Sequence, residues 1–136
     1  MRPVIFSMKG KVSMAKTFIN LTNHPSAKWG IEQLTAAGKY GHIVDIPFPA
    51  VDPEASSAVI GSMADTCIEN IREYEEPVVL VQGEFTLVFA IVTRLKMMGI
   101  RAFAACSERA VEEQVSEDGV ARKSVVFRFC GFREYV

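Results

Sequence analysis

The chain has 136 residues, about the length of one domain and too short for two separate hydrophobic cores. Hydrophobic residues make up 49% of it and charged residues 23%, a composition that excludes a disordered or fibrous protein. Its 15 basic and 16 acidic residues give a net charge of -1 without a basic stripe, which excludes tracking along a long nucleic acid. We therefore expect any anionic ligand to be small and locally held.

The sequence also argues against a membrane or secreted protein. No run approaches the roughly 20 apolar residues that a membrane-spanning helix needs, and residues 1–13 lack the features of a signal peptide. Cys67, Cys106 and Cys130 are odd in number and far apart, so neither a disulfide framework nor a zinc site is indicated. We expect a cytoplasmic protein with buried thiols and no metal or other cofactor.

Residues 1–13 show little periodicity and are interpreted as a leader or as an extra edge strand. Residues 14–136 are expected to form one domain. Its first strand is predicted over 17–21, an apolar run that a breaker follows. Ser26 is a candidate cap for a helix over 27–37, with Gly38 as its left-handed terminal residue.

The second strand is predicted over 42–46. Asp52 stands before a proline, the pattern of a helix start, and predicts a helix over 54–74. Apolar residues recur there at steps of three and four, which gives the helix one apolar stripe.

A continuous apolar run over 77–81 predicts a central strand, followed by a helix over 84–98. The core face of this helix is assigned to Phe85, Val88, Phe89, Val92 and Leu95. Leu87 and Ile91 fall on a second apolar flank, which either serves a dimer contact or is also buried.

A fourth strand is predicted over 100–105, and a short helical turn begins over 107–109. A terminal strand is predicted over 124–129, with a hairpin partner around 115–121 as an option. The strand-helix rhythm predicts the α/β class: a Rossmann-like, three-layer α/β/α domain with a mostly parallel sheet of about five strands. The C-terminal strand or hairpin is the part of the sheet that can run antiparallel.

Ligands of open parallel sheets bind where the strands end and helix N-termini point outward. His24 follows the first strand, and its imidazole is a candidate general acid or base, or else a packed loop residue. Glu84 follows Gly83 at a helix start, where a catalytic role and simple stabilisation by the helix are both possible. Ser107 and Arg109 offer a hydroxyl and a cation for a phosphate, or alternatively a cap and an ion pair.

Four segments in order resemble the small stand-alone ring nucleases of type III CRISPR immunity, which have a CRISPR-associated Rossmann-like fold. The resemblance spans about 16–135, whereas residues 1–13 have no counterpart and 25–29 differ from the pattern. The matching segments are Asn23-His24 with Ser26, Val81-Gln82-Gly83-Glu84-Phe85-Thr86, Ser107-Glu108-Arg109, and Phe127-Arg128-Phe129 with Phe132-Arg133-Glu134-Tyr135.

This resemblance implies metal-independent cleavage of a cyclic oligoadenylate messenger, with cyclic tetra-adenylate the expected ring. The ribose 2′-hydroxyl attacks the neighbouring phosphate, and the enzyme supplies positioning, proton transfer and charge stabilisation. The implied catalytic residues are His24, Glu84, Ser107 and Arg109. The implied substrate-binding residues are Asn23, Ser26, Gln82, Gly83, Thr86, Glu108 and Arg133.

A ring of identical nucleotides has rotational symmetry, so a homodimer is expected to grip it with loops from both subunits. Two other functions remain open on the sequence. The domain can bind the ring as a sensor without cleaving it, or it can be an unrelated small-molecule enzyme or structural partner using the same crevice.

Overall fold

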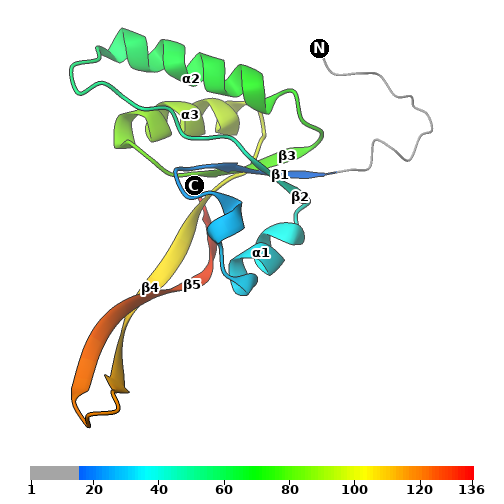
Figure 1. Cartoon of the computed structure of the whole chain (residues 1–136). Helices are drawn as coiled ribbons and strands as arrows, with labels where there is room; N and C mark the ends of the chain where they lie inside the picture. The colour runs from blue at the N-terminus through cyan, green and yellow to red at the C-terminus, as the bar shows by residue number, and fades with distance from the viewer. Residues whose placement is uncertain (1–15) are drawn as a thin grey trace.

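A computed structural model describes residues 16–136, and the expectations for residues 1–13 lie outside this part of the chain. The sheet has five strands in the order β2-β1-β3-β4-β5 (Figure 1). Strands β1 to β4 are parallel and β5 is antiparallel to β4, which confirms the predicted fold class. The strands are β1 (Thr17–Leu21), β2 (His42–Asp45), β3 (Pro77–Val81), β4 (Ala102–Val115) and β5 (Ala121–Glu134).

Helices cover both faces of the sheet. Helices α2 and α3 lie together on one face, and α1 lies on the other, so the domain has three layers (Figure 1). In residues 16–136 no helix is both long and apolar enough to cross a membrane. The helical segments are the 3-10 turn η2 (Ser26–Lys28), α1 (Ile31–Gly38), α2 (Ser57–Ile71) and α3 (Phe85–Met97).

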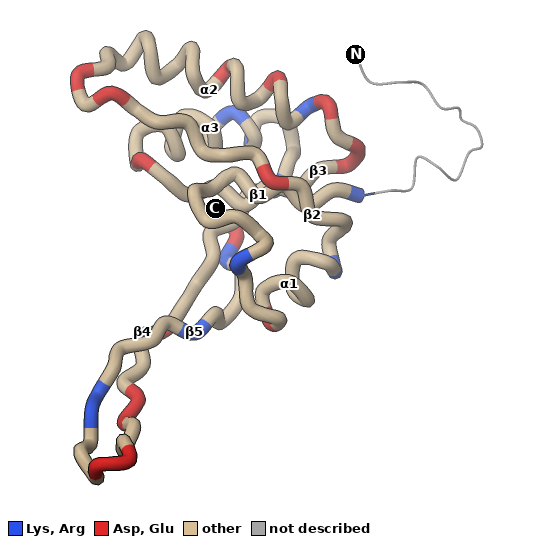
Figure 2. Tube along the Cα trace, in the orientation of Figure 1, with Lys and Arg blue, Asp and Glu red and all other residues tan. Residues whose placement is uncertain are grey.

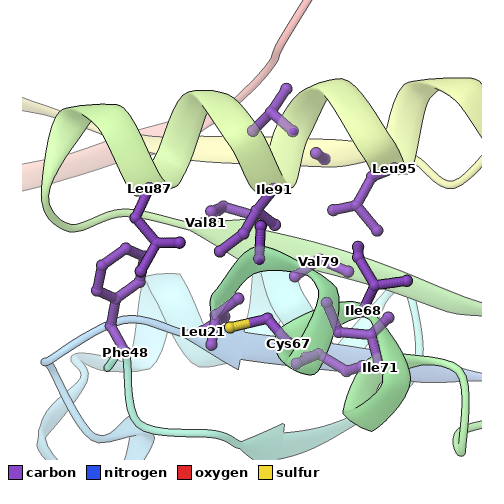
Figure 3. Packing of buried hydrophobic residues seen from close by; sticks show 14 of the residues in the cluster. Leu21, Phe48, Cys67, Ile68, Ile71, Val79, Val81, Leu87, Ile91 and Leu95 are labelled. Atoms are coloured by element: carbon purple, nitrogen blue, oxygen red, sulfur yellow. The ribbon is translucent and has the colours of Figure 1, made fainter. Parts of the chain in front are cut away.

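The core is divided by the sheet because successive strand side chains point to opposite faces. Ile19 and Val79 meet α2 and α3 in the larger cluster, where Ile91 is fully buried (Figure 3). Phe18 and Phe103 belong to a smaller, aromatic-rich cluster on the α1 side. The strands β1 and β3 are thus buried on both faces, which explains why apolar residues dominate both sequences.

The helix predicted over 27–37 is wrong at its start. The chain makes only the short turn η2 there, and α1 begins after Gly30. Ser26 does not cap α1, because its hydroxyl donates to Asp45 instead. Gly38 is the last residue of α1, but its φ is not positive, so it is not the predicted left-handed residue. Gly41 has a positive φ of 156°, and its backbone lies close to that of Lys16.

The start predicted for α2 is also wrong. Asp52 Oδ1 accepts a hydrogen bond from the Glu54 N–H at 2.8 Å, which closes a local turn rather than a helix. The helix begins five residues later than Asp52, at Ser57, with Ser56 as its cap. The hydroxyl of Ser56 accepts from the Val59 N–H at 3.2 Å.

The extent predicted for α3 is confirmed, and its predicted core face is confirmed at Val92 and Leu95 but wrong at Phe85 and Phe89. Leu87 and Ile91 are fully buried, whereas Phe85 and Phe89 are 88% and 73% exposed. The helix is apolar on two flanks, so periodicity alone cannot tell which flank meets α2 and the sheet.

The helical turn predicted over 107–109 is wrong, because β4 continues through these residues to Val115. With β5 it forms a long hairpin, here called the arm (107–115 and 121–129), which projects beyond the layers (Figure 1). Both faces of the arm carry exposed side chains, so its sequence lacks the continuous apolar run of a strand that is covered on both faces.

The expectation of three buried thiols holds only for Cys67. Burial raises the pKa of the Cys67 thiol above its usual value. Cys106 is half-buried and Cys130 is exposed, because both lie at the base of the arm where the sheet loses its helical cover.

Candidate functional site

A cavity of about 520 Å³ lies between the base of the arm and the segment that joins β1 to α1. It opens beyond the carboxyl end of β1, the region where open α/β sheets bind their ligands. Its lining residues are His24, Lys28, Trp29, Gly30, Glu32, Gln33, Ser107, Phe127, Arg128 and Phe129.

A buried hydrogen-bond network holds the His24 loop in place. The amide nitrogen of Asn20, only 1% exposed, donates to the His24 carbonyl at 2.8 Å and to Asp45 Oδ1 at 3.0 Å. The hydroxyl of Thr22 donates to Asn20 Oδ1 at 2.8 Å, and the indole N–H of Trp29 donates to the His24 carbonyl at 3.2 Å. The backbone of His24 is therefore fixed, while its exposed side chain lines the cavity.

Asp45, at the end of β2, fixes the next part of the same loop. Its Oδ2 accepts from the Ser26 hydroxyl at 3.0 Å and from the Ser26 N–H at 3.2 Å. Ser26 is thus engaged inside the loop and does not line the cavity. Asn23 is exposed and likewise lies outside the lining.

The arm supplies the opposite wall. Ser107 pairs with Phe129 and Arg109 with Phe127, so strand alternation puts these four side chains on one face. Arg109 does not line the cavity and lies two residues beyond Ser107, toward the tip of the arm. A register shift between Cys106 and Ser107 marks a β-bulge, a feature that bends strands and redirects side chains.

Glu108 and Arg128 pair on the other face of the arm. The Arg128 guanidinium contacts Glu112 Oε2 at 3.0 Å, so its charge is already paired, although Arg128 also contributes to the cavity lining. Arg133 pairs with Ala104 in the sheet and is outside the lining.

The segment after β3 has structural roles. Gln82 Oε1 accepts from the Ala105 N–H at 2.7 Å, which ties the end of β3 to β4 two residues before Ser107. Gly83 lies against the ring of Phe48, and a Cβ at this position would collide with that ring. The glycine is therefore explained by packing rather than by a ligand.

Glu84 is the cap of α3. Its Oε1 accepts from the Thr86 hydroxyl at 2.6 Å and from the Leu87 N–H at 2.8 Å. These hydrogen bonds, the one from Thr86 foremost, lower the pKa of Glu84 below its usual value. Neither Glu84 nor Thr86 lines the cavity.

Of the eleven residues predicted for the site, the cavity brings together His24 and Ser107, with Arg109 beside them. The cavity is also lined by residues that the sequence did not predict for the site, although the two phenylalanines among them lay within a matching segment: Lys28, Trp29, Gln33, Phe127 and Phe129. The spacing of two residues between the phenylalanines on a strand was the available indication that they share one face.

The cavity combines several kinds of recognition chemistry. Trp29, Phe127 and Phe129 present aromatic surfaces that suit stacked bases, and the Phe127 side chain is 70% exposed. Lys28 offers a cation for a phosphate, and Gly30 marks the N-terminus of α1. Within residues 16–136, no three His, Cys, Asp or Glu side chains are grouped to hold a metal ion.

No curated protein and no solved structure gives a significant match to the chain. The model of the family described as "Uncharacterized protein MJ1673 family" matches residues 16–133, which is well over half of the sequence. The chain therefore belongs to the MJ1673 family.

Proposed function

We propose that the cavity binds a cyclic oligoadenylate, with cyclic tetra-adenylate as the preferred ring, and that the protein cleaves it. The observation that carries this proposal is the meeting of an imidazole, an ammonium and three aromatic rings in one cavity. Aromatic rings stack on bases, a cation neutralises phosphate, and an imidazole exchanges protons near neutral pH. The role proposed for the protein is to end type III CRISPR signalling in the cytoplasm.

The proposed reaction is a transesterification. The ribose 2′-oxygen forms a bond to phosphorus while the bond from phosphorus to the 5′-oxygen breaks, and the products are a 2′,3′-cyclic phosphate and a 5′-hydroxyl. His24 accepts the proton of the 2′-hydroxyl and returns a proton to the departing 5′-oxygen. Lys28 stabilises the charge that develops on the phosphate oxygens, and Ser107 orients the ring. Glu84 has no part in proton transfer in this scheme because it caps α3.

The proposal includes a homodimer. A volume of about 520 Å³ is that of a site for a drug-sized molecule, and a ring of four nucleotides is larger. One subunit therefore holds part of the ring, and two-fold symmetry supplies a second cavity for the rest.

The test is incubation of the pure protein with cyclic tetra-adenylate and cyclic hexa-adenylate in the presence of a chelator, followed by chromatography. Linear products with cyclic phosphate ends support the nuclease. His24→Ala should abolish cleavage, whereas His42→Ala should retain it, because His42 begins β2 at the opposite end of the strands. The proposal fails if neither ring is bound, or if both histidine variants cleave at the wild-type rate.

A sensor that binds the ring without cleaving it is the second candidate. The placement of Glu84 outside the cavity favours it, because only His24 then remains of the two residues predicted to transfer protons. Tight binding by the wild-type protein without products would identify the sensor.

A further inference from the structure

The arm has one apolar face. Strand register puts Val111 opposite Val125, and alternation puts Val115 and Phe127 on the same face as this pair. All four side chains are exposed, by 56% for Val111, 68% for Val115, 46% for Val125 and 70% for Phe127. Four large apolar side chains thus share one surface of a two-stranded ribbon.

No second layer covers this face within residues 16–136. The arm leaves the three-layer body and projects past α1 (Figure 1). A two-stranded hairpin is marginally stable in water on its own, and an apolar sheet face requires another layer to bury it. The arm therefore has the composition of a strand pair that packs against a partner.

The charges of the arm are compatible with a second copy as that partner. On the apolar face Glu113 stands opposite Lys123, so this face carries both signs, as the arm does as a whole (Figure 2). On the other face, Arg128 and Glu112 already form an ion pair at 3.0 Å. Arg109 also lies on the apolar face, so a second copy that approaches this face meets two basic side chains and one acidic side chain rather than a run of like charges.

The exposed area is also of the right order. An aromatic side chain has about 200 Å² of surface. With the exposed fractions given above, Phe127 and the three smaller valines together expose roughly 350 Å² of apolar surface. This is nearly half of the roughly 800 Å² that each partner contributes to a standard protein interface. The charged and polar side chains along the ribbon supply the remainder as a rim.

We propose that the apolar face of the arm packs face to face with the same face of a second copy, about a two-fold axis. Such an interface is self-complementary, since each copy contributes the same valines. This proposal rests on the homodimer of the proposed function and specifies which surface of each subunit forms the interface. Because Phe127 belongs both to this face and to the cavity, the interface ends beside the cavity of each copy.

The test is sedimentation velocity on the full chain without ligand, from about 1 μM to about 100 μM, a range that detects micromolar dissociation constants. The wild-type protein should be dimeric, and Val111→Glu should raise the dissociation constant at least about tenfold. Val125→Lys, on the other strand of the arm, should act in the same way. Val59→Glu is the matched control, because Val59 is a comparably exposed valine on α2 and should leave the dimer intact.

Far-UV circular dichroism and a melting curve confirm that each variant is folded. A monomeric wild-type protein would overturn the inference, as would folded arm variants that dimerise like the wild type. Loss of the dimer in Phe89→Glu with retention in Val111→Glu would assign the contact to α3 instead. Since no ring is present, these results are independent of whether the cavity binds or cleaves a cyclic nucleotide.

Discussion

Substitution of Asn20 by aspartate tests whether the buried network fixes the loop that carries His24. The two side chains have nearly the same shape, but aspartate replaces an N–H donor by an oxygen. In the wild-type protein this donor lies 2.8 Å from the His24 carbonyl and 3.0 Å from Asp45 Oδ1. In Asn20→Asp, the His24 carbonyl and Asp45 Oδ1 therefore face an oxygen of the new carboxylate, which cannot donate to them, in a site that is 1% exposed.

The magnitude follows from these contacts. Two lost hydrogen bonds cost about 1 kcal/mol each, and an unpaired carboxylate in a buried site raises the total to about 3–5 kcal/mol. Burial and the charge of Asp45 raise the pKa of the new carboxyl in the folded state above its unfolded value. The penalty is then fully present at neutral pH and shrinks as the pH falls through the folded-state pKa, because the protonated carboxyl can donate to Asp45 again.

The assay is urea unfolding at pH 7 and at pH 5, with Asn23→Asp as the matched control. Asn23 is exposed three residues along the same loop and should change the free energy of unfolding by less than about 0.5 kcal/mol. Equal free energies of unfolding for Asn20→Asp and Asn23→Asp would refute the role assigned to the network.

Three further predictions concern packing, pH and ligand binding. Gly83→Ala should lower the free energy of unfolding by about 1–3 kcal/mol, because the new methyl group meets the ring of Phe48. Gly38→Ala, at the end of α1 with open space around it, should raise it by about 0.5–1 kcal/mol in the same urea titration. Burial raises the pKa of Tyr135 in the folded protein. The wild-type free energy of unfolding should therefore decline as the pH rises from the ordinary tyrosine pKa toward the higher pKa of the folded state. In the same pH series, Tyr135→Phe should lack this decline. Glu32→Gln should tighten binding of cyclic tetra-adenylate in calorimetry, since it removes a negative charge from the cavity wall, and unchanged or weaker binding would contradict a phosphate site there.

The parallel part of the fold was predictable because burial on both faces leaves a strong mark in the sequence. The run at 77–81 is apolar throughout and the run at 17–21 is interrupted only by Thr17 and Asn20, and they became β3 and β1 with the predicted bounds. The arm was not predictable in this way. Its strands have no covered face, so Ser107 to Arg109 resembled a helix start rather than the continuation of β4.

The candidate site was partly predictable for a related reason. His24 follows the end of β1, and the topology of a parallel sheet alone directs attention to such a position. Lys28 and Phe127 were missed because they come from η2 and from an antiparallel strand, whose positions depend on tertiary packing. Glu84 was predicted for the site but lies outside the cavity, because a carboxylate at a helix start can act as a cap without a catalytic role.

The two histidines allow the central claim, that the cavity beside the arm is the nucleotide site, to be measured in one titration. His24 lines the cavity and His42 lies at the other end of the sheet, so their imidazole NMR signals report on two separate places. Addition of cyclic tetra-adenylate should shift the His24 signals in a saturable manner and leave those of His42 unchanged. Saturable shifts at His42 with none at His24, or no shifts at either residue, would contradict the account.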